Sequence, residues 1–314
     1  RQEILDSEIY RVDTIDGIKL NQNECPWDVP LDLKVRNTER LIKTDWNRYP
    51  VVDLVMLQKK LAKIYNLQPD QIVVANGANV LIQAVVNITR PDDKTLILDP
   101  CFHAFETQAK LHGNKIIKVP LSEEFELLVE KTLAVIKKEK PALILLSNPS
   151  APTGTLFDKR SLYRIIQSAG CPVVVDEAYY PFSEETVVAW LEDFDNLIVL
   201  RTFSKTMALA GVRFGFALSS LEIAAQIEKF LTPFRISCIT SAIIDEVLDH
   251  PDYSREYIAL LNKERARMFA AMQKIEKIRV FPSEANFLLF RVESARVVAN
   301  RLLEEKILVR NLSD

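Results

Sequence analysis

Residues 142–176 read ALILLSNPSAPTGTLFDKRSLYRIIQSAGCPVVVD, and this stretch decides the fold. It begins with one continuous apolar run, Ala142–Ser147, and closes with a second, Pro172–Asp176. Between the two runs, Asp158 is placed to cap a helix that continues to Ser168. Continuous runs of Val, Ile and Leu that are separated by helices indicate a mainly parallel sheet covered on both faces. The stretch therefore predicts an α/β domain.

The same alternation of short apolar runs and amphipathic stretches extends from about residue 70 to residue 220. Further strands are expected at Gln71–Asn76, Lys94–Asp99, Lys115–Val119, Leu197–Leu200 and Phe214–Leu218. Further helices are expected at Ala78–Thr89, Phe102–His112 and Glu123–Lys138. The pattern predicts a mainly parallel, seven-stranded type of sheet sandwiched by helices.

Beyond residue 220 the pattern changes to longer helices and isolated short strands. The expected helices are Leu221–Leu231, Ile239–Leu248, Asp252–Ile275 and Ser294–Glu305, and the expected strands lie near Arg279–Phe281, Phe287–Arg291 and Ile307–Arg310. This mixture predicts a smaller α+β domain. Because the chain stops soon after its last expected strand, we expect the domain to be truncated, with further residues after Asp314.

Composition and charge exclude several classes of protein. The chain has 314 residues, 48% of them hydrophobic, and its 40 basic and 43 acidic residues give a net charge of −3. The sequence has no block of like charges of the kind that would predict a nucleic-acid partner. No apolar run is long enough to cross a membrane. The 4 cysteines and 3 histidines have no metal-ligand spacing. We expect a cytoplasmic protein with reduced thiols and no metal.

Four polar motifs come directly after four of the expected strands. They are Asn76-Gly77-Ala78-Asn79, the loop Asn148–Gly154, Asp176-Glu177-Ala178-Tyr179 and Thr202-Phe203-Ser204-Lys205. In open α/β sheets, ligands bind outside the carboxyl ends of the strands. We therefore expect the four motifs to form one shared site.

Single residues in these motifs have both an ordinary and a functional interpretation. Lys205 is either a solvated surface lysine or an amine whose pKa is lowered enough to attack a carbonyl. Asp176 is either a turn residue or the acid that holds a cationic ring nitrogen. Arg213, which glycines bracket, is either part of a surface ion pair or a bidentate clamp for phosphate. The turn Gly77-Ala78-Asn79 opens a helix whose N–H groups can cradle an anion.

Taken together, these groups are what pyridoxal phosphate requires of a protein. The lysine forms a Schiff base, the acid pairs with the pyridinium nitrogen, and the arginine and the helix start hold the phosphate.

Further motifs run along nearly the whole chain. They are Leu20-Asn21-Gln22-Asn23-Glu24-Cys25-Pro26, Arg48-Tyr49-Pro50, Asn148-Pro149 with Pro152-Thr153-Gly154, Asp176-Glu177-Ala178-Tyr179, Ser204-Lys205 with Leu209–Gly215, Pro282–Phe287 and Ile307–Arg310. With these motifs the chain resembles the histidinol-phosphate aminotransferases, which are fold-type-I pyridoxal-phosphate enzymes. The resemblance implies transfer of an amino group from histidinol phosphate to 2-oxoglutarate, giving imidazole acetol phosphate and glutamate in histidine biosynthesis.

The resemblance also implies a role for each matching residue. Lys205 would bind the cofactor covalently and move a proton between the substrate's α-carbon and the C4′ carbon of the cofactor. Asp176 would pair with the pyridinium nitrogen, Tyr179 would hydrogen-bond the ring oxygen, and Phe102 would stack on the ring. The other cofactor-binding residues implied are Ala78, Asn79, Asn148, Ser204 and Arg213.

The implied domains are an N-terminal arm (residues 1–30) packing on the small domain, a large cofactor-binding domain (31–232) and a small C-terminal domain (233–314). Tyr49 would reach the cofactor phosphate of a partner subunit, so the resemblance implies a homodimer with shared sites. Asn23 and Arg310 would contact the substrate.

The chain departs from the family pattern in two places. Ala151 stands where the family has an asparagine that hydrogen-bonds the ring oxygen of the cofactor. Loss of such a bond costs on the order of 1 kcal/mol, and up to about 3 kcal/mol if the oxygen stays unsatisfied. A later arginine of the family, a second contact for the acidic end of the substrate, does not occur in these residues.

Two alternatives remain open at this point. A threonine-phosphate decarboxylase, or another amino-acid aminotransferase of this fold, would share the cofactor and most of the motifs. A catalytically silent homologue that serves as a binding or regulatory module would be free to lose the lysine, yet Lys205, Asp176, Tyr179 and Arg213 are all present.

Overall fold

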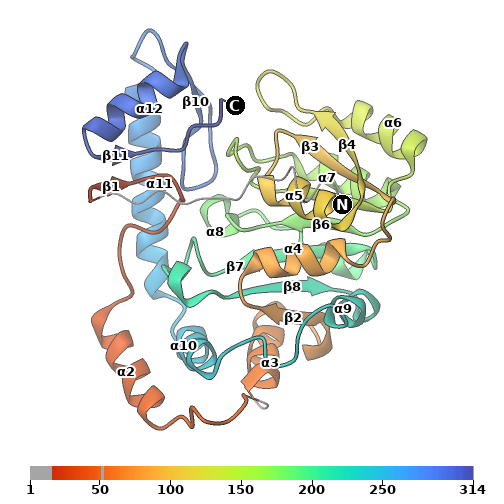
Figure 1. Cartoon of the computed structure of the whole chain (residues 1–314), viewed down its shortest axis with the longest axis vertical. Coiled ribbons are helices and arrows are strands. Elements are labelled where there is room, and N and C mark those ends of the chain that lie inside the picture. Colours follow the sequence, from red (N-terminus) through yellow and green to blue (C-terminus); the bar gives the residue numbers. More distant parts are fainter. Residues whose placement is uncertain (1–15, 51–52, 314) are drawn as a thin grey trace.

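The computed structural model describes residues 16–50 and 53–313 of the chain (Figure 1). Its centre is a 7-stranded sheet with the strand order β2-β8-β7-β6-β5-β3-β4. The strands are β2 (Ile72–Ala75), β3 (Lys94–Asp99), β4 (Lys115–Pro120), β5 (Leu143–Ser147), β6 (Val173–Asp176), β7 (Leu197–Thr202) and β8 (Gly215–Ser219). Only β8 runs antiparallel to its neighbours in this sheet. The predicted mainly parallel α/β sheet is confirmed.

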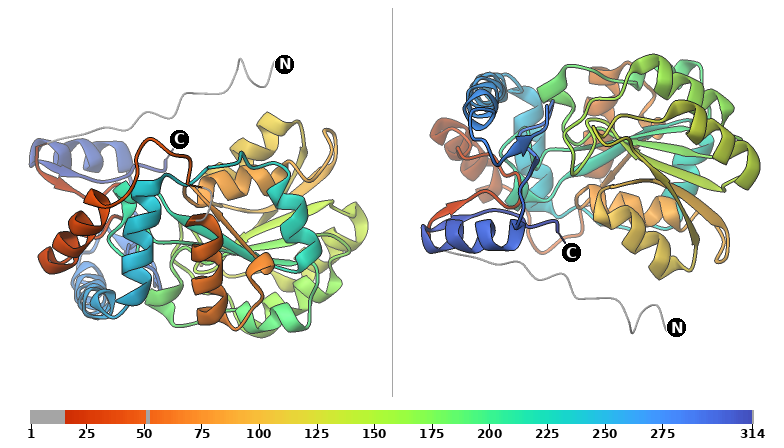
Figure 2. Two further views of the ribbon diagram at one scale, coloured as in Figure 1. Left: turned by 90° about the horizontal axis from the view of Figure 1, so that it is seen from below. Right: turned by 90° about the horizontal axis from the view of Figure 1, so that it is seen from above.

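Helices cover both faces of this sheet, as the two views of Figure 2 show. One face packs against α3 (Asp53–Tyr65), α6 (Val129–Glu139) and α7 (Lys159–Ser168), and the other against α4 (Ala78–Val86), α5 (His103–His112) and α9 (Leu221–Glu228). Ile72 and Val74 of β2 belong to the first core, whereas Val73 and Ala75 belong to the second. Because successive residues of a strand point to opposite faces, burial on both faces requires the unbroken apolar runs of the sequence.

Two helix starts show how local side chains set the element boundaries. Asp158 caps α7 as predicted, since its Oδ2 accepts a bond from a backbone N–H in the first turn at 2.9 Å. The helix predicted over 123–138 begins only at Val129. Before it, Ser122 Oγ accepts a bond from the N–H of Glu126 at 2.9 Å. This side chain forms a local turn that competes with helical hydrogen bonding, so the helix starts later than its periodicity predicts.

The C-terminal part of the chain forms a separate group of elements beside the sheet (Figure 1). It contains α11 (Tyr253–Met272), β9 (Arg279–Val280), β10 (Phe290–Arg291), α12 (Ala295–Glu304) and β11 (Ile307–Leu308). β9 and β10 pair antiparallel, and β11 pairs in parallel with β1 (Ile18–Lys19) from the other end of the described chain. Residues 1–15 of the expected N-terminal arm lie outside the described residues. The division of the chain after residues 30 and 232 stays a prediction.

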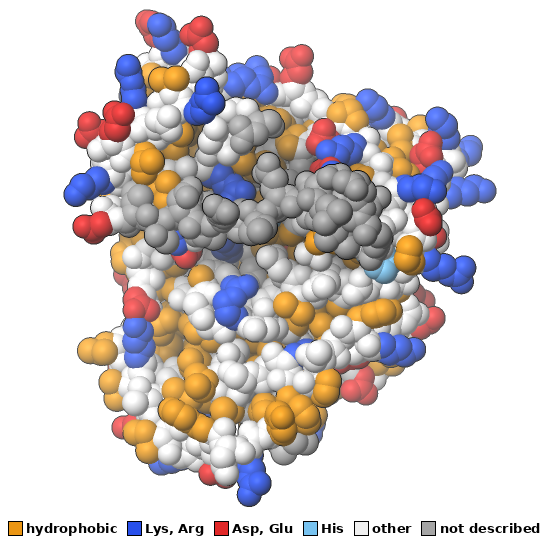
Figure 3. All heavy atoms as spheres, in the orientation of Figure 1, with side chains coloured by type: hydrophobic (Ala, Val, Ile, Leu, Met, Phe, Trp, Pro, Cys, Tyr) orange, Lys and Arg blue, Asp and Glu red, His pale blue; other side chains and the backbone are white. Residues whose placement is uncertain are grey.

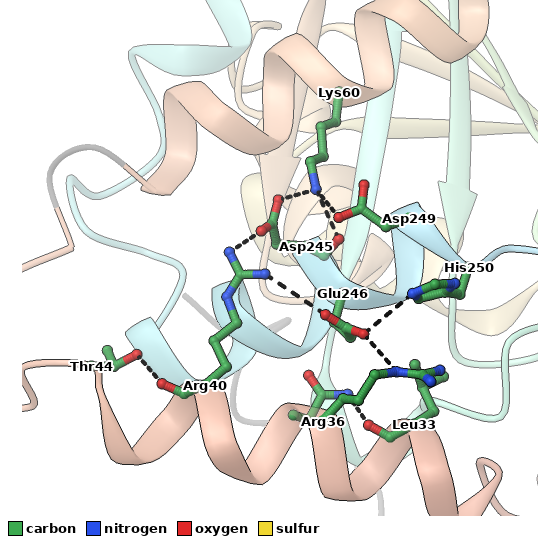
Figure 4. A network of polar contacts seen from close by, with 10 residues as sticks. Leu33, Arg36, Arg40, Thr44, Lys60, Asp245, Glu246, Asp249 and His250 are labelled. Atoms are coloured by element: carbon green, nitrogen blue, oxygen red, sulfur yellow. Dashed lines mark hydrogen bonds and ion pairs between the residues drawn. The ribbon is translucent and has the colours of Figure 1, made fainter.

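A polar network joins α2 (Leu31–Ile42) and α3 to α10 (Cys238–Asp249), as Figure 4 shows. Asp245 of α10 is only 4% exposed and forms ion pairs with Arg40 of α2 and with Lys60 of α3. The Lys60 Nζ to Asp245 Oδ1 distance is 2.6 Å. Because a buried carboxylate must be compensated, the two cations fix both helices on α10. Within the described residues, no helix has both the length and the apolar character to cross a bilayer.

Candidate active site

The register of the sheet brings the four predicted motifs to one edge. Ser147, the last residue of β5, lies opposite Asp176, the last residue of β6. Thr202 at the end of β7 and Ala75 at the end of β2 both lie opposite Gly215, the first residue of the antiparallel strand β8. The loops after these residues therefore open on the same side of the sheet, where ligands bind in open α/β folds.

Lys205 follows β7 and is partly buried. Its Nζ donates a hydrogen bond to the backbone oxygen of Gln22 at 2.5 Å. Burial lowers the pKa of Lys205 to about 8. The positive charge of Arg213 also lowers this pKa, whereas the negative charge of Glu24 raises it. At neutral pH a share of the Lys205 side chains is therefore uncharged, and the uncharged amine is the form that attacks a carbonyl.

Asp176 lies at the bottom of the same site, where 5% of the residue is exposed. Its Oδ1 accepts a hydrogen bond from the N–H of Ala178 at 3.1 Å. Burial raises the pKa of Asp176 to about 7. The hydrogen bond from Ala178 lowers this pKa, the negative charge of Glu177 raises it further, and the positive charge of Lys205 lowers it. A buried carboxyl of this kind ionises readily when a cation is placed beside it. The position therefore suits a positively charged ring nitrogen.

Tyr179 belongs to a small apolar cluster beside these two residues. The buried members are Ala151, Tyr179, Phe182 and Ala285, and the partly buried Phe102 and Phe287 pack against them. The Tyr179 hydroxyl accepts a hydrogen bond from Nδ2 of Asn23 at 3.0 Å. Burial raises the pKa of Tyr179 to about 12, against the Asn23 bond that lowers it, so the hydroxyl keeps its proton. The structure thus places Ala151 and Phe102 in one cluster with Tyr179.

Arg213, Ser204 and the start of α4 form a cradle of hydrogen-bond donors. Nη1 of Arg213 lies 3.3 Å from Oγ of Ser204. A Cβ atom on Gly77, whose φ is 91°, would lie 2.6 Å from Nη2 of Arg213, and one on Gly215 would lie 2.6 Å from the N atom of Ala78. Glycine is therefore required for this close approach. A guanidinium, a hydroxyl and free helix amides are the donors that bind phosphate, so these residues fit the phosphate of pyridoxal phosphate.

Three other predicted residues lie at the edge of this site. Asn79 is exposed in the first turn of α4. Asn148 is buried, and its Oδ1 accepts a backbone N–H bond at 2.8 Å, so its side chain holds the loop in place. Arg310 is exposed, and its charge adds to burial in lowering the pKa of His103, the neighbour of Phe102 in the chain. Arg310, from the C-terminal part of the chain, is therefore near enough to His103 for its charge to be felt there.

Tyr49 lies apart from these groups. It is 75% exposed, and its ring stacks on Phe234 with a centroid distance of 4.6 Å. Within the part of the chain that the structure describes, no ring contact or hydrogen bond joins Tyr49 to Lys205. The described ring contact of Tyr49 is thus with Phe234 and not with the group around Lys205.

The chain matches the family described as aminotransferase class I and II over residues 15–313. It belongs to this family. The aminotransferase is 33% identical over 314 residues to the histidinol-phosphate aminotransferase of Deinococcus radiodurans, a comparison that covers 99% of this chain and 87% of the relative. It is 36% identical over 298 residues to the histidinol-phosphate aminotransferase of Pelodictyon phaeoclathratiforme, with coverages of 94% and 84%.

Solved structures show the same relationship. The histidinol-phosphate aminotransferase of Clostridium acetobutylicum superimposes with a TM-score of 0.86 at 28% identity, covering 93% of this chain and 89% of that one. The enzyme of Sinorhizobium meliloti, solved in complex with pyridoxal-5'-phosphate, has the same fold, with a TM-score of 0.85 at 23% identity and coverages of 94% and 82%. The aminotransferase is a pyridoxal-phosphate-dependent enzyme, as its sequence predicts.

Two features of the aminotransferase site were not predicted from the sequence. A buried ion pair joins Oε2 of Glu177, the residue after Asp176, to Nη2 of Arg201 at 2.6 Å. The sequence contains a sign of this ion pair, since the charged residue Arg201 directly follows the apolar run Leu197–Leu200. A buried charge requires a partner. The second feature is the bond from Lys205 to Gln22, which is made by a backbone oxygen and therefore has no side-chain signature.

Proposed function

We propose that this aminotransferase acts in the cytoplasm on histidinol phosphate and 2-oxoglutarate and produces imidazole acetol phosphate and glutamate in histidine biosynthesis. Relatives at 33% and 36% identity are histidinol-phosphate aminotransferases. The structural observation that carries the proposal is the partly buried amine of Lys205 at a strand end. Its charge and that of Asp176 influence each other's pKa.

Lys205 has the central role in this proposal. Bound pyridoxal phosphate supplies an aldehyde for the lysine and a ring that withdraws electrons from the α-carbon of the substrate. With a pKa near 8, Lys205 would take a proton from the α-carbon as a neutral amine and, as an ammonium group, would return it to the C4′ carbon of the cofactor. The carbonyl of Gln22 directs its Nζ through a hydrogen bond of 2.5 Å.

Three side chains orient the cofactor ring in this proposal. Asp176 pairs with the ring nitrogen, because a cation beside it favours its ionised form. Tyr179, which keeps its proton, donates to the ring oxygen. Phe102 packs against the cluster around Tyr179 and offers its ring for stacking. The phosphate is held by Ala78, Asn79, Ser204 and Arg213, and Asn148 fixes the adjoining loop.

We also propose that the aminotransferase is a homodimer with shared sites. Tyr49 would contact the cofactor phosphate of the partner subunit, because it is exposed and its ring stacks on Phe234, which is not among the site residues described above. In Figure 3, hydrophobic side chains gather on the lower part of the face, where Figure 1 places α2 and α3. The exposed apolar residues of α2 and the segment after it are Leu31, Val35, Ile42 and Trp46. Exposed apolar side chains gathered on one face are typical of protein interfaces.

The substrate end of the proposed site is formed by parts of the chain outside the sheet. Arg310 would meet the acidic end of the substrate, and Asn23 lines the site beside Tyr179. The proposed domains are the arm (1–30), which packs on the small domain through the pairing of β1 with β11, the large domain (31–232) and the small domain (233–314).

A half-reaction assay tests the proposed function. The cofactor-loaded protein is mixed with histidinol phosphate, threonine phosphate or aromatic amino acids, and conversion of the bound cofactor to its pyridoxamine form is followed by absorbance. We expect fastest conversion with histidinol phosphate. Release of carbon dioxide from threonine phosphate without conversion would instead identify a decarboxylase, which is a function of one structural neighbour with a TM-score of 0.82 at 22% identity. A silent homologue would convert with no donor.

A further inference from the structure

The hydroxyl of Tyr179 is held from outside the sheet, by the segment at residues 17–30. Nδ2 of Asn23 donates to this hydroxyl at 3.0 Å. The buried neighbours of Tyr179 in its cluster are Ala151, Phe182 and Ala285, whose side chains carry no donor or acceptor. Within the described residues, the hydrogen bond of the Tyr179 hydroxyl is the one from Asn23, and the charge of Asp176 also acts on Tyr179.

Asn23 is itself fixed by the C-terminal part of the chain. Nδ2 of Asn286 donates to the backbone oxygen of Asn23 at 3.0 Å. The strand just before it pairs with β11, where the N–H of Leu20 donates to the oxygen of Leu308 at 2.8 Å. The φ of Asn23 is 54°, a left-handed conformation that asparagine adopts more readily than most residues. Among the described residues, the contacts that set the position of the amide come from the C-terminal part of the chain and not from the seven-stranded sheet.

A phenol has one proton and an oxygen that accepts hydrogen bonds. Because Asn23 donates to the oxygen of Tyr179, the phenolic proton must point in another direction. Burial also raises the pKa of Tyr179 to about 12, so the proton is present across the neutral range. An oxygen that accepts one hydrogen bond becomes a stronger donor through its own proton, since chains of hydrogen bonds polarise one another.

We propose that Asn23 is a positioning residue of the aminotransferase, which acts through Tyr179 by directing the phenolic proton toward the ring oxygen of the cofactor. This inference rests on the role of Tyr179 in the proposed function. A positioning role differs from a contact between Asn23 and the substrate. Asn23 would influence the cofactor through Tyr179 even before any substrate is bound. It also gives the N-terminal segment a function in tuning the cofactor.

A double-mutant cycle with Asn23→Gly and Tyr179→Phe tests this inference. Glycine removes the amide but tolerates the positive φ of this position. The readout is the pH at which the absorption of the bound cofactor changes, measured without substrate, together with the dissociation constant of the cofactor. A bond to the ring oxygen stabilises its deprotonated form, so we expect Asn23→Gly to raise this pKa by about half a unit. In the Tyr179→Phe background we expect Asn23→Gly to cause no further shift.

Leu20→Ala serves as the matched control, because Leu20 lies in the same segment, its side chain is exposed, and it pairs with Leu308 through its backbone N–H. An unchanged cofactor pKa in this control, with the expected non-additive shifts, supports the inference. If Asn23→Gly causes no shift, or the same shift with and without Tyr179, the inference is wrong while the proposed function stands. If Tyr179→Phe itself leaves the cofactor pKa unchanged, the role of Tyr179 fails and the inference fails with it.

Discussion

The lowered pKa of Lys205 predicts a reactivity that can be measured in the absence of the cofactor. With a pKa of about 8 instead of the ordinary 10.5, roughly one Lys205 side chain in eleven is neutral at pH 7, against roughly one in three thousand for an ordinary lysine. At equal access, Lys205 should therefore react with an amine-specific reagent roughly 300-fold faster than an unperturbed lysine at this pH.

The charges around Lys205 predict the direction in which this reactivity changes. Glu24 stabilises the ammonium form of Lys205 and also pairs with Lys19 at 2.7 Å. Glu24→Gln removes one negative charge and frees one positive charge, and both changes lower the pKa of Lys205. We expect a further decrease of roughly half a pKa unit, the size of a partly exposed ion pair.

Competitive labelling measures the pKa of Lys205 in the wild type and in Glu24→Gln. The cofactor-free protein is labelled across pH 6 to 11, and the peptides are quantified by mass spectrometry. The other lysines in the same digest provide the comparison, and circular dichroism verifies the fold of the variant. A labelling midpoint of Lys205 near that of the exposed lysines would refute the argument that burial tunes this amine. A midpoint that rises in Glu24→Gln would refute the assignment of the neighbouring charges.

Three further predictions concern the cofactor and the dimer. Asp176→Asn should retain the cofactor but lose most of its turnover, because a neutral amide does not stabilise a protonated ring nitrogen; near-normal steady-state rates would contradict this role. Mixed dimers of Lys205→Ala and Tyr49→Phe chains should recover part of the activity that each variant lacks, since one site per dimer is intact; hybrids verified by mass spectrometry that show no recovery would indicate sites built within one chain. Ala151→Asn adds a donor beside the cluster of Tyr179 and should lower the cofactor pKa by somewhat under one unit in a spectroscopic titration, and an unchanged value would place the Ala151 loop away from the ring.

The central sheet could be predicted from the sequence because each strand is buried on both faces and therefore reads as an apolar run. The cluster of motifs at the strand ends followed from the same topology, which brought Asp176 and Thr202 to one edge. The start of α6 could not be predicted, since its position depends on one side chain, Ser122, that captures a backbone N–H. Periodicity describes the faces of an element better than its ends.

The contacts of the N-terminal segment with the site were beyond prediction for a different reason. β1 has 2 residues, too few to show a period of 2 or 3.6. Its partner is β11, so the pairing that places Gln22 and Asn23 depends on residues far away in the sequence. Asn23 was expected as a substrate contact, and its bond to Tyr179 emerges only from the folded chain.

The pairing of β1 with β11 also has a consequence for how the enzyme is made. On the ribosome, all the strands of the large sheet emerge before residues 307–308 are synthesised, and domains fold largely in the order of synthesis. The nascent sheet can therefore position Lys205 and Tyr179 while the first strand still has no partner. Gln22 and Asn23 reach these two residues only when β11 has formed. The segment with Gln22 and Asn23 is thus synthesised before the strands of the large sheet but takes its place after them, and the amine of Lys205 lacks its Gln22 contact until then.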